Sequence, residues 1–308
     1  MDGSAEPRIP GLCDTYQNNI TEISLTGSPL SHSEKLPGEY FRYKGILFPL
    51  GLYSPESIST AGDSQDVRSD DIFIITYPKS GTNWMIEIVS LILKDGDPSW
   101  IRTVPIWERA PWCETIVGAF SLPNQNSPRI RSSHLPIQLF NKAVFNAKAK
   151  VPRREGLQFG SWFDHIKGWI RMQGKEHFLF TTYEELHQDF RGSVKRVAEF
   201  LGRPLSPEAL DSVVAHSAFG AMKANSMSNY TLLPPSLLDN RQGAFLRKGV
   251  CGDWKNYFTV AQSEAFDRVY QEQMRGQPTF PWDEAQKDAS ADPDPSPCQA
   301  PESPDPWP

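Results

Sequence analysis

Two apolar stretches with different spacing follow each other in the first third of the chain. The first is the run "IFIIT" at residues 72–76, in which branched apolar side chains occupy successive positions, as is typical of a strand buried on both faces. The second is "TNWMIEIVSLILKDG" at residues 82–96, which has helical length and ends on a glycine. The pattern predicts a buried strand, a short loop and a helix.

The same order returns in the second half of the chain. The stretch "HFLFTT" at residues 177–182 predicts another strand, and "YEELHQDFRGSVKRVAEFLG" at residues 183–202 predicts a helix after it. A repeated order of strand and helix predicts an α/β fold with a central parallel sheet flanked by helices. The chain shows no internal repeat.

Both ends of the chain differ in composition from the part between them. Residues 1–36 are rich in Ser, Gly, Pro and Thr, and residues 285–308 are acidic and rich in proline. Neither end has enough apolar side chains to offset the entropy lost on ordering. We therefore expect a flexible N-terminal extension (1–36), one globular domain (37–284) and a disordered tail (285–308).

Composition and charge narrow the class of partner. A chain of 308 residues, 39% of them hydrophobic, can bury one large core. The formal net charge of -6 disfavours a broad electrostatic contact with nucleic acid or an anionic membrane, but a local basic pocket can still hold a small anion.

The sequence gives no indication of a metal site, a signal peptide or a membrane helix. The four cysteines form no CxxC pair and the six histidines are scattered, so no metal site is expected. The acidic start of the chain is unlike a signal peptide, and no apolar run approaches the ~18 residues of a membrane helix. We expect a cytosolic protein with a small-molecule partner.

The loop between the first strand and helix concentrates groups that bind phosphate. It lies within "YPKSGTNW" at residues 77–84, where Gly81 allows close backbone approach and Lys79 supplies a positive charge. The alternative is an ordinary turn with a solvated lysine. Because Lys79 precedes the only loop glycine, the pattern differs from G-x-x-x-x-G-K-[ST], which disfavours an NTPase or kinase.

This loop and three later motifs resemble, in the same order, those of the cytosolic sulfotransferases. The stretches "VPIWERAPW" and "MSNYTLLPPSLLD" make the chain most similar to the hydroxysteroid branch, and the proline-rich tail points to its cholesterol-type 2B subgroup. The resemblance covers roughly residues 36–284. It implies transfer of a sulfuryl group from 3'-phosphoadenylyl sulfate (PAPS) to a steroid or sterol hydroxyl, giving a steroid sulfate and 3',5'-ADP. The later motifs are "SSHLP" at residues 132–136, "TYEEL" at residues 182–186 and "RKGVCGDWKNYFT" at residues 247–259.

The resemblance assigns catalytic and cofactor roles residue by residue. His134 matches the base that takes the acceptor proton, and Lys79 matches the cation that stabilises the leaving phosphate. Taken alone, a histidine before Leu-Pro or a tryptophan on a buried helix is more often structural. The matched cofactor positions are Lys79, Ser80, Gly81, Thr82, Asn83, Trp84 (stacking on adenine), Tyr183, Ser217, Phe219, Arg247, Lys248 and Gly249.

Two further groups are assigned in the same way. Trp107, Trp112, Tyr230, Leu232 and Leu233 would supply apolar walls for a flat sterol, although all could be core residues. The stretch "KNYFTVAQSE" fits the family's dimer motif, K-x-x-x-T-V-x-x-x-E, and implies a homodimer; the alternative is a capped helix start with exposed charges. The motif positions are Lys255, Thr259, Val260 and Glu264.

The chain departs from the family pattern at "KAKVPRREGLQFGSWF", residues 148–163. After Val151 the family continues a central strand and a helix, where an arginine and a serine hold the 3'-phosphate. Here we expect several tens of residues to be missing near residues 151–157. Pro152 cannot donate a ladder hydrogen bond in a central strand, and Arg153 and Arg154 match no family position. The alternative function is therefore an impaired variant that only dimerises or binds lipid, or fails to fold.

Overall fold

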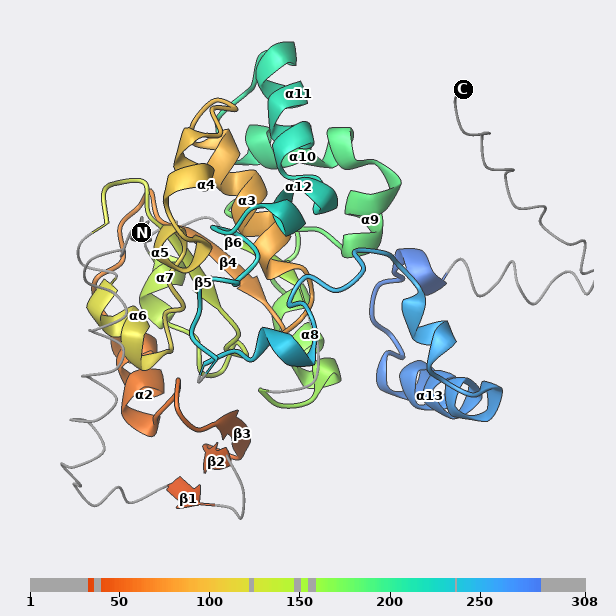
Figure 1. Ribbon diagram of the computed structural model, residues 1–308. Helices are drawn as coiled ribbons and strands as arrows, with labels where there is room; N and C mark the ends of the chain where they lie inside the picture. Colours follow the sequence, from red (N-terminus) through yellow and green to blue (C-terminus); the bar gives the residue numbers. More distant parts are fainter. Residues whose placement is uncertain are drawn as a thin grey trace, which may run out of the picture.

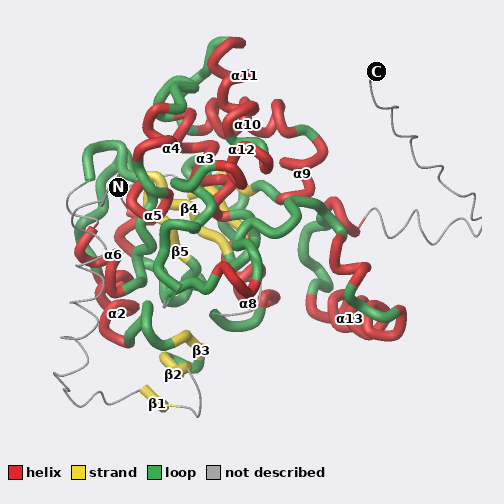
Figure 2. The backbone as a smooth tube through the Cα atoms, in the orientation of Figure 1, coloured by secondary structure: helices red, strands yellow, loops and turns green. Residues whose placement is uncertain are grey.

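The computed structural model describes residues 33–35, 40–121, 125–146, 151–154, 159–235 and 237–283. Most of the predicted N-terminal extension and the whole predicted C-terminal tail lie outside the described residues. The described chain forms a parallel sheet surrounded by helices and a second, small antiparallel sheet (Figures 1 and 2).

The parallel sheet has the strand order β5-β4-β6-β7. All five residues of β4 are buried, because the strand has neighbours on both sides and helices over its faces. The predicted α/β class with a parallel sheet is confirmed. The strands are β4 (Ile72–Thr76), β5 (Ile130–Ser133), β6 (Val151–Arg154) and β7 (Phe178–Phe180).

The helix predicted after β4 is α3 (Thr82–Ile92), and the turn predicted at Gly96 follows it. Gly96 has φ +85 and its N–H donates to Leu91 O at 2.9 Å, which closes the helix. The other helices are α2 (Pro55–Asp63), α4 (Ser99–Thr103), α5 (Ile106–Arg109), α6 (Ile116–Ser121), α7 (Lys142–Asn146), α8 (Trp162–Ile170), α9 (Tyr183–Gln188), α10 (Phe190–Phe200), α11 (Pro207–His216), α12 (Phe219–Ala224), α13 (Val260–Gln273) and the 3-10 turns η2 (Asn240–Gln242) and η3 (Asp253–Asn256).

The single helix predicted over residues 183–202 is wrong in one respect, because two helices cover this stretch. Asp189 separates α9 from α10, and its carboxylate accepts the N–H of Gly192 at 2.8 Å. An aspartate in this position caps the start of a new helix. Helical periodicity continues across the break, so the pattern alone did not reveal it.

The core lies on both faces of the parallel sheet, as the alternation of side chains along β4 requires. Ile72 and Ile74 belong to a buried cluster with residues of α3, α10 and α11. Phe73 and Ile75 belong to a second cluster, with residues of α8 and of the antiparallel strands. These strands are β1 (Ser33–Lys35), β2 (Tyr40–Tyr43) and β3 (Ile46–Pro49). In Figure 1, α3, α10 and α11 lie on one side of the sheet and β2 and β3 on the other.

The chain keeps a strand where we expected the central strand to be interrupted. The backbone of β6 pairs with β4 through Ile75↔Arg153 and Thr76↔Arg154, and with β7 through Pro152↔Leu179 among others. Pro152 therefore does lie in a central strand, although it has no N–H to contribute to the ladder. The register places the backbone of Arg154 beside Thr76, which is the last residue of β4 before the phosphate loop.

Candidate functional site

The loop between β4 and α3 is shaped by two residues in the left-handed region. Lys79 has φ +65 and Gly81 has φ +91. Gly81 precedes the first turn of α3, so no side chain caps the free N–H groups there. Asn83 Nδ2 is buried and has no partner among the described residues. An uncapped helix start with a spare donor fits a phosphate group.

The Lys79 ammonium lies on an aromatic ring from a distant segment. Its Nζ is 3.6 Å from the centroid of Phe245, and the Phe245 ring lies 4.4 Å from that of Tyr230. Although the side chain is partly exposed, desolvation lowers the Lys79 pKa. The segment before Arg247 therefore covers the phosphate loop.

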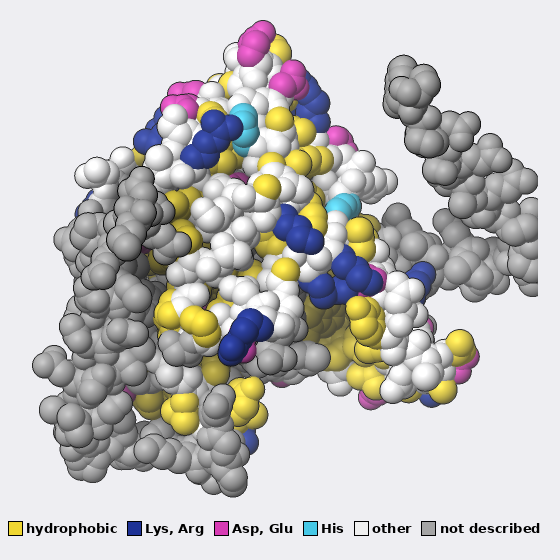
Figure 3. Space-filling model, in the orientation of Figure 1, with side chains coloured by type: hydrophobic (Ala, Val, Ile, Leu, Met, Phe, Trp, Pro, Cys, Tyr) yellow, Lys and Arg dark blue, Asp and Glu magenta, His cyan; other side chains and the backbone are white. Residues whose placement is uncertain are grey.

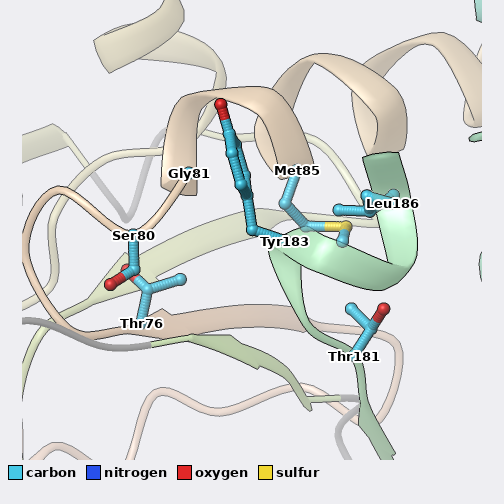
Figure 4. A pocket seen from close by; sticks show the side chains of 7 residues that line it. All are labelled: Thr76, Ser80, Gly81, Met85, Thr181, Tyr183 and Leu186. Carbon is cyan, nitrogen blue, oxygen red and sulfur yellow. The ribbon is translucent and has the colours of Figure 1, made fainter. Parts of the chain in front are cut away.

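A small pocket lies beside this loop, at the carboxyl ends of β4 and β7 (Figure 4). It brings together Ser80, Gly81 and Tyr183, which are three of the predicted cofactor-binding residues. In Figure 4 the Tyr183 ring, at the start of α9, stands next to the loop at Gly81. The remaining lining residues are Thr76, Met85, Thr181 and Leu186.

His134 follows β5 directly and is linked to the phosphate helix through β4. Its Nδ1 lies 2.8 Å from Thr76 O, and Thr76 Oγ1 lies 2.6 Å from the hydroxyl of Thr82 in α3. Because a carbonyl oxygen only accepts, Nδ1 is assigned the proton and Nε2 is left as the acceptor. Burial lowers the His134 pKa to about 3, so the ring is neutral. A neutral imidazole can accept a proton at Nε2.

The surroundings of Trp84 resemble a core more than an open stacking surface. Its ring centroid lies 5.3 Å from that of Tyr183, 5.1 Å from that of His187 and 5.0 Å from that of Phe190. Nε1 is buried without a partner among the described residues. The stacking of Trp84 on adenine stays a prediction.

The two cations predicted to bind the 3'-phosphate share an anionic partner. Arg247 Nη1 and Lys248 Nζ both donate to Asp253, the second at 2.8 Å. These bonds raise the pKa of Arg247 and Lys248 and hold the Asp253 pKa far below its usual range. A phosphate at this place has to compete with the Asp253 carboxylate.

Gly249 brings this segment against α12. It has φ +68, and a Cβ on Gly249 would lie 2.2 Å from Cδ2 of Phe219, so any larger residue would displace the ring. Ser217 is buried, and its hydroxyl donates to Val213 O at 2.5 Å, within the end of α11. The structure thus joins Phe219 to Gly249, whereas the Ser217 hydroxyl is already bonded.

The residues predicted to form the acceptor walls fall into two groups. The Trp112 ring lies 4.0 Å from that of His134. The Trp107 ring lies 5.5 Å from that of Tyr230, which also contacts Phe245. Leu233 packs against the core, but Leu232 is 42% exposed. Of these five residues, Trp112 is the one whose ring lies beside His134, the predicted base.

Glu114 is a residue of the site that the sequence analysis missed. It is 0% exposed, and its Oε1 accepts the N–H of His134 at 2.6 Å. Burial raises the Glu114 pKa to about 7, against the opposing effect of this hydrogen bond. Nothing in the sequence around "PWCET" distinguishes this carboxylate from a surface one.

Replacing Glu114 with glutamine should stabilise the protein above neutral pH. Between pH 4.5, the usual pKa of the group, and about pH 7, the folded protein keeps the Glu114 proton that the unfolded chain has lost. The free energy of unfolding therefore falls as pH rises through this interval. That interval corresponds to about 3 kcal/mol. Thermal melts should show the variant gaining over the unchanged chain at about pH 8 but not at about pH 4.5. An advantage that is the same at both pH values would contradict the expectation.

Within the described ranges, no group of three or more His, Cys, Asp or Glu side chains is placed to hold a metal ion. None of the helices in the same ranges is long and apolar enough to cross a membrane.

Comparisons with known proteins agree with the geometry. The sulfotransferase domain family matches residues 69–151 and 154–278. Sulfotransferase 2B1 of Homo sapiens is 67% identical over 320 positions, covering 92% of this chain and 85% of the relative. The 3-beta-hydroxysteroid sulfotransferase of Cavia porcellus is 46% identical, covering 79% of this chain and 97% of the relative.

A solved structure shows the same fold. Mouse sulfotransferase SULT7A1, in complex with PAP, superimposes with a TM-score of 0.62 at 25% identity, covering 82% of this chain and 99% of that one. The human relative covers most of the chain, and the family match includes β4, α3 and His134. This chain therefore belongs to the sulfotransferase family.

Proposed function

We propose that the chain transfers the sulfuryl group of PAPS to the hydroxyl of a steroid or sterol, in the cytosol. The observation that carries the proposal is the link between a neutral His134 and the uncapped start of α3, made through Thr76. The relative named 3-beta-hydroxysteroid sulfotransferase and the neighbour bound to PAP support the acceptor class and the co-substrate.

The residues of the site divide the chemistry between them. PAPS supplies the sulfuryl group and a phosphate that leaves as the bond to sulfur breaks. His134 Nε2 takes the proton of the acceptor hydroxyl as its oxygen attacks. Lys79 and the N–H groups of α3 would stabilise the charge that grows on the leaving phosphate, which lowers the barrier more than it strengthens binding.

The acceptor class is tested by competition. With PAPS present, a 3β-hydroxysteroid and a simple phenol of equal concentration should give mainly the steroid sulfate, because Trp112 places an apolar wall beside the base. Preferential sulfation of the phenol would contradict the steroid assignment and leave the transfer reaction intact. Nothing in the comparisons favours the alternative of a non-catalytic chain that only dimerises or binds lipid.

The departure from the family pattern near Val151 affects how the chain binds the 3'-phosphate of PAPS. The family match is split between residues 151 and 154, and the human alignment spans 320 positions, more than the 308 residues of this chain. Residues of the relative are therefore absent here. We propose that the missing stretch includes the family's 3'-phosphate contacts and leaves Arg247 and Lys248 as the cations for that group.

Calorimetry with 3',5'-ADP and 5'-AMP should then show little preference for the first. Inserting the corresponding segment of the human relative after Val151 should restore the preference for 3',5'-ADP. The binding free energy of 3',5'-ADP should improve by roughly 3 to 6 kcal/mol, as expected for two charge-assisted contacts. Strong discrimination by the unchanged chain would contradict this and would point to Arg153 or Arg154 as the replacement.

We also propose a homodimer through the motif that begins at Lys255. Thr259 caps α13, since its hydroxyl accepts the N–H of Gln262, and Val260 is 75% exposed. The capped helix start that was the alternative reading is therefore present, and it leaves Val260 free to contact a second copy. Figure 3 shows hydrophobic side chains on the face between the body of the protein and α13.

Replacing Val260 with glutamate should give monomers without unfolding, because short interfaces depend on few residues. The matched control is Val269→Glu, an exposed valine on the same helix. Light scattering should show a dimer for the unchanged chain and the control, and a monomer for the variant. A monomeric unchanged chain would refute the dimer.

A further inference from the structure

Glu114 is a buried carboxyl group beside His134 that has no part in the chemistry described above. It lies between α5 and α6, on a segment joined to β5 because Cys113 N–H donates to Ser132 O at 2.9 Å. Trp112 of the same segment packs 4.0 Å from the His134 ring. One short segment thus brings both an apolar wall and a carboxyl group to the base.

The two oxygens of Glu114 have different surroundings. Oε1 accepts the N–H of His134 at 2.6 Å. Oε2 is buried and has no hydrogen-bond partner among the residues that the structure describes. A buried carboxylate oxygen without a partner destabilises the fold when it is charged, and a glutamine would avoid that charge. Buried ionisable groups that destabilise the fold in this way are typical of functional sites.

Among the described residues, no cation shifts the pKa of Glu114. Burial raises it, and the hydrogen bond from the His134 N–H lowers it. Burial also raises the Tyr53 pKa and brings the Cys113 pKa to about 12, so both side chains are neutral near pH 7. The ionisable groups around Glu114 are His134 after β5, Tyr53 before α2 and Cys113, on which Arg131 and Asp71 also act.

We propose that Glu114 is a positioning residue for sulfuryl transfer: Oε1 holds the His134 main chain, and the ionised carboxylate favours the protonated imidazole. The inference rests on the proposed function. His134 receives the acceptor proton as the acceptor oxygen bonds to sulfur and the electron pair of the broken bond leaves with the phosphate. A cation then exists in a buried site, where a nearby negative charge stabilises it. Glu114 keeps its own protonation state during the step.

This role gives the reaction a specific pH dependence. Because the Glu114 pKa is about 7, the fraction of ionised carboxylate, and with it kcat, should rise through about pH 7. His134 cannot cause that rise, because its pKa is lowered to about 3 and it is neutral throughout.

The test compares kcat and KM between about pH 6 and about pH 9 for the unchanged chain and three variants. Glu114→Gln keeps an acceptor for the His134 N–H but removes the charge, and Glu114→Asp keeps the charge. Glu108→Gln is the matched control, because Glu108 lies on α5 and burial also raises its pKa. Circular dichroism verifies that each variant is folded.

We expect Glu114→Gln to lose about tenfold in kcat above about pH 8, which corresponds to one pKa unit of proton affinity at His134, with KM nearly unchanged. In Glu114→Gln, kcat should no longer rise through about pH 7, whereas in Glu114→Asp and Glu108→Gln it should still rise. An active, folded Glu114→Gln variant with the pH profile of the unchanged chain would overturn the role of Glu114. If Glu114→Gln does not fold, a flat profile for the unchanged chain or for Glu114→Asp would overturn it. Absence of transfer by the folded, unchanged chain would instead overturn the proposed function itself.

Discussion

Replacing Lys79 with alanine should lower kcat by about a thousandfold and change KM much less. Lys79 lies in the loop that leads into α3, and in the proposed reaction the leaving phosphate gains charge at this loop as its bond to sulfur breaks. A charge that acts on the leaving group stabilises the transition state more than the bound substrates. Steady-state kinetics with PAPS and a 3β-hydroxysteroid measure both constants.

The matched control for Lys79 is Lys94→Ala. Lys94 is also a lysine on an aromatic ring, with Nζ 5.2 Å from the Trp100 centroid, but it follows the other end of α3. Its loss should leave kcat within about twofold, as for surface substitutions in general. If Lys79→Ala kept kcat and changed only KM, the lysine would serve binding and not the chemistry.

Replacing His134 with alanine should lower transfer by about two to four orders of magnitude and leave the affinity for 3',5'-ADP unchanged. In the proposed reaction the histidine acts on the acceptor proton through Nε2, while its Nδ1 contacts Thr76 O. Calorimetry with 3',5'-ADP and an assay of steroid sulfate separate the two effects.

The control for His134 is His177→Ala, at the partly exposed residue before β7. It should retain full transfer. An equal loss of nucleotide binding and transfer in His134→Ala would show that this histidine supports the fold and is not the base.

The predictable part of the fold was the part that local pattern determines. The apolar run of β4 and the amphipathic helix after it were predicted from spacing alone. The break at Asp189 was not, because the cap depends on one side chain inside an otherwise helical period. The pairing of β6 with β4 and β7 was not predicted either, since Pro152 argues locally against a central strand and only the neighbouring strands place it there.

For the candidate site, too, local sequence pattern predicted one part and could not predict another. The phosphate loop follows from a strand, a glycine and a helix in sequence, and the structure confirms that geometry around Gly81. Two contacts between distant segments could not be predicted: Phe245 on Lys79, and Glu114 on His134. Each joins residues that only tertiary packing brings together, so no spacing along the chain signals it.

The most direct test is transfer of labelled sulfur from PAPS to a 3β-hydroxysteroid by the unchanged chain, with Lys79→Ala as the blank. The site described here predicts labelled steroid sulfate and 3',5'-ADP in equal amounts from the unchanged chain, and almost none from the variant. A folded chain that binds 3',5'-ADP but leaves the steroid unlabelled would contradict the proposed function.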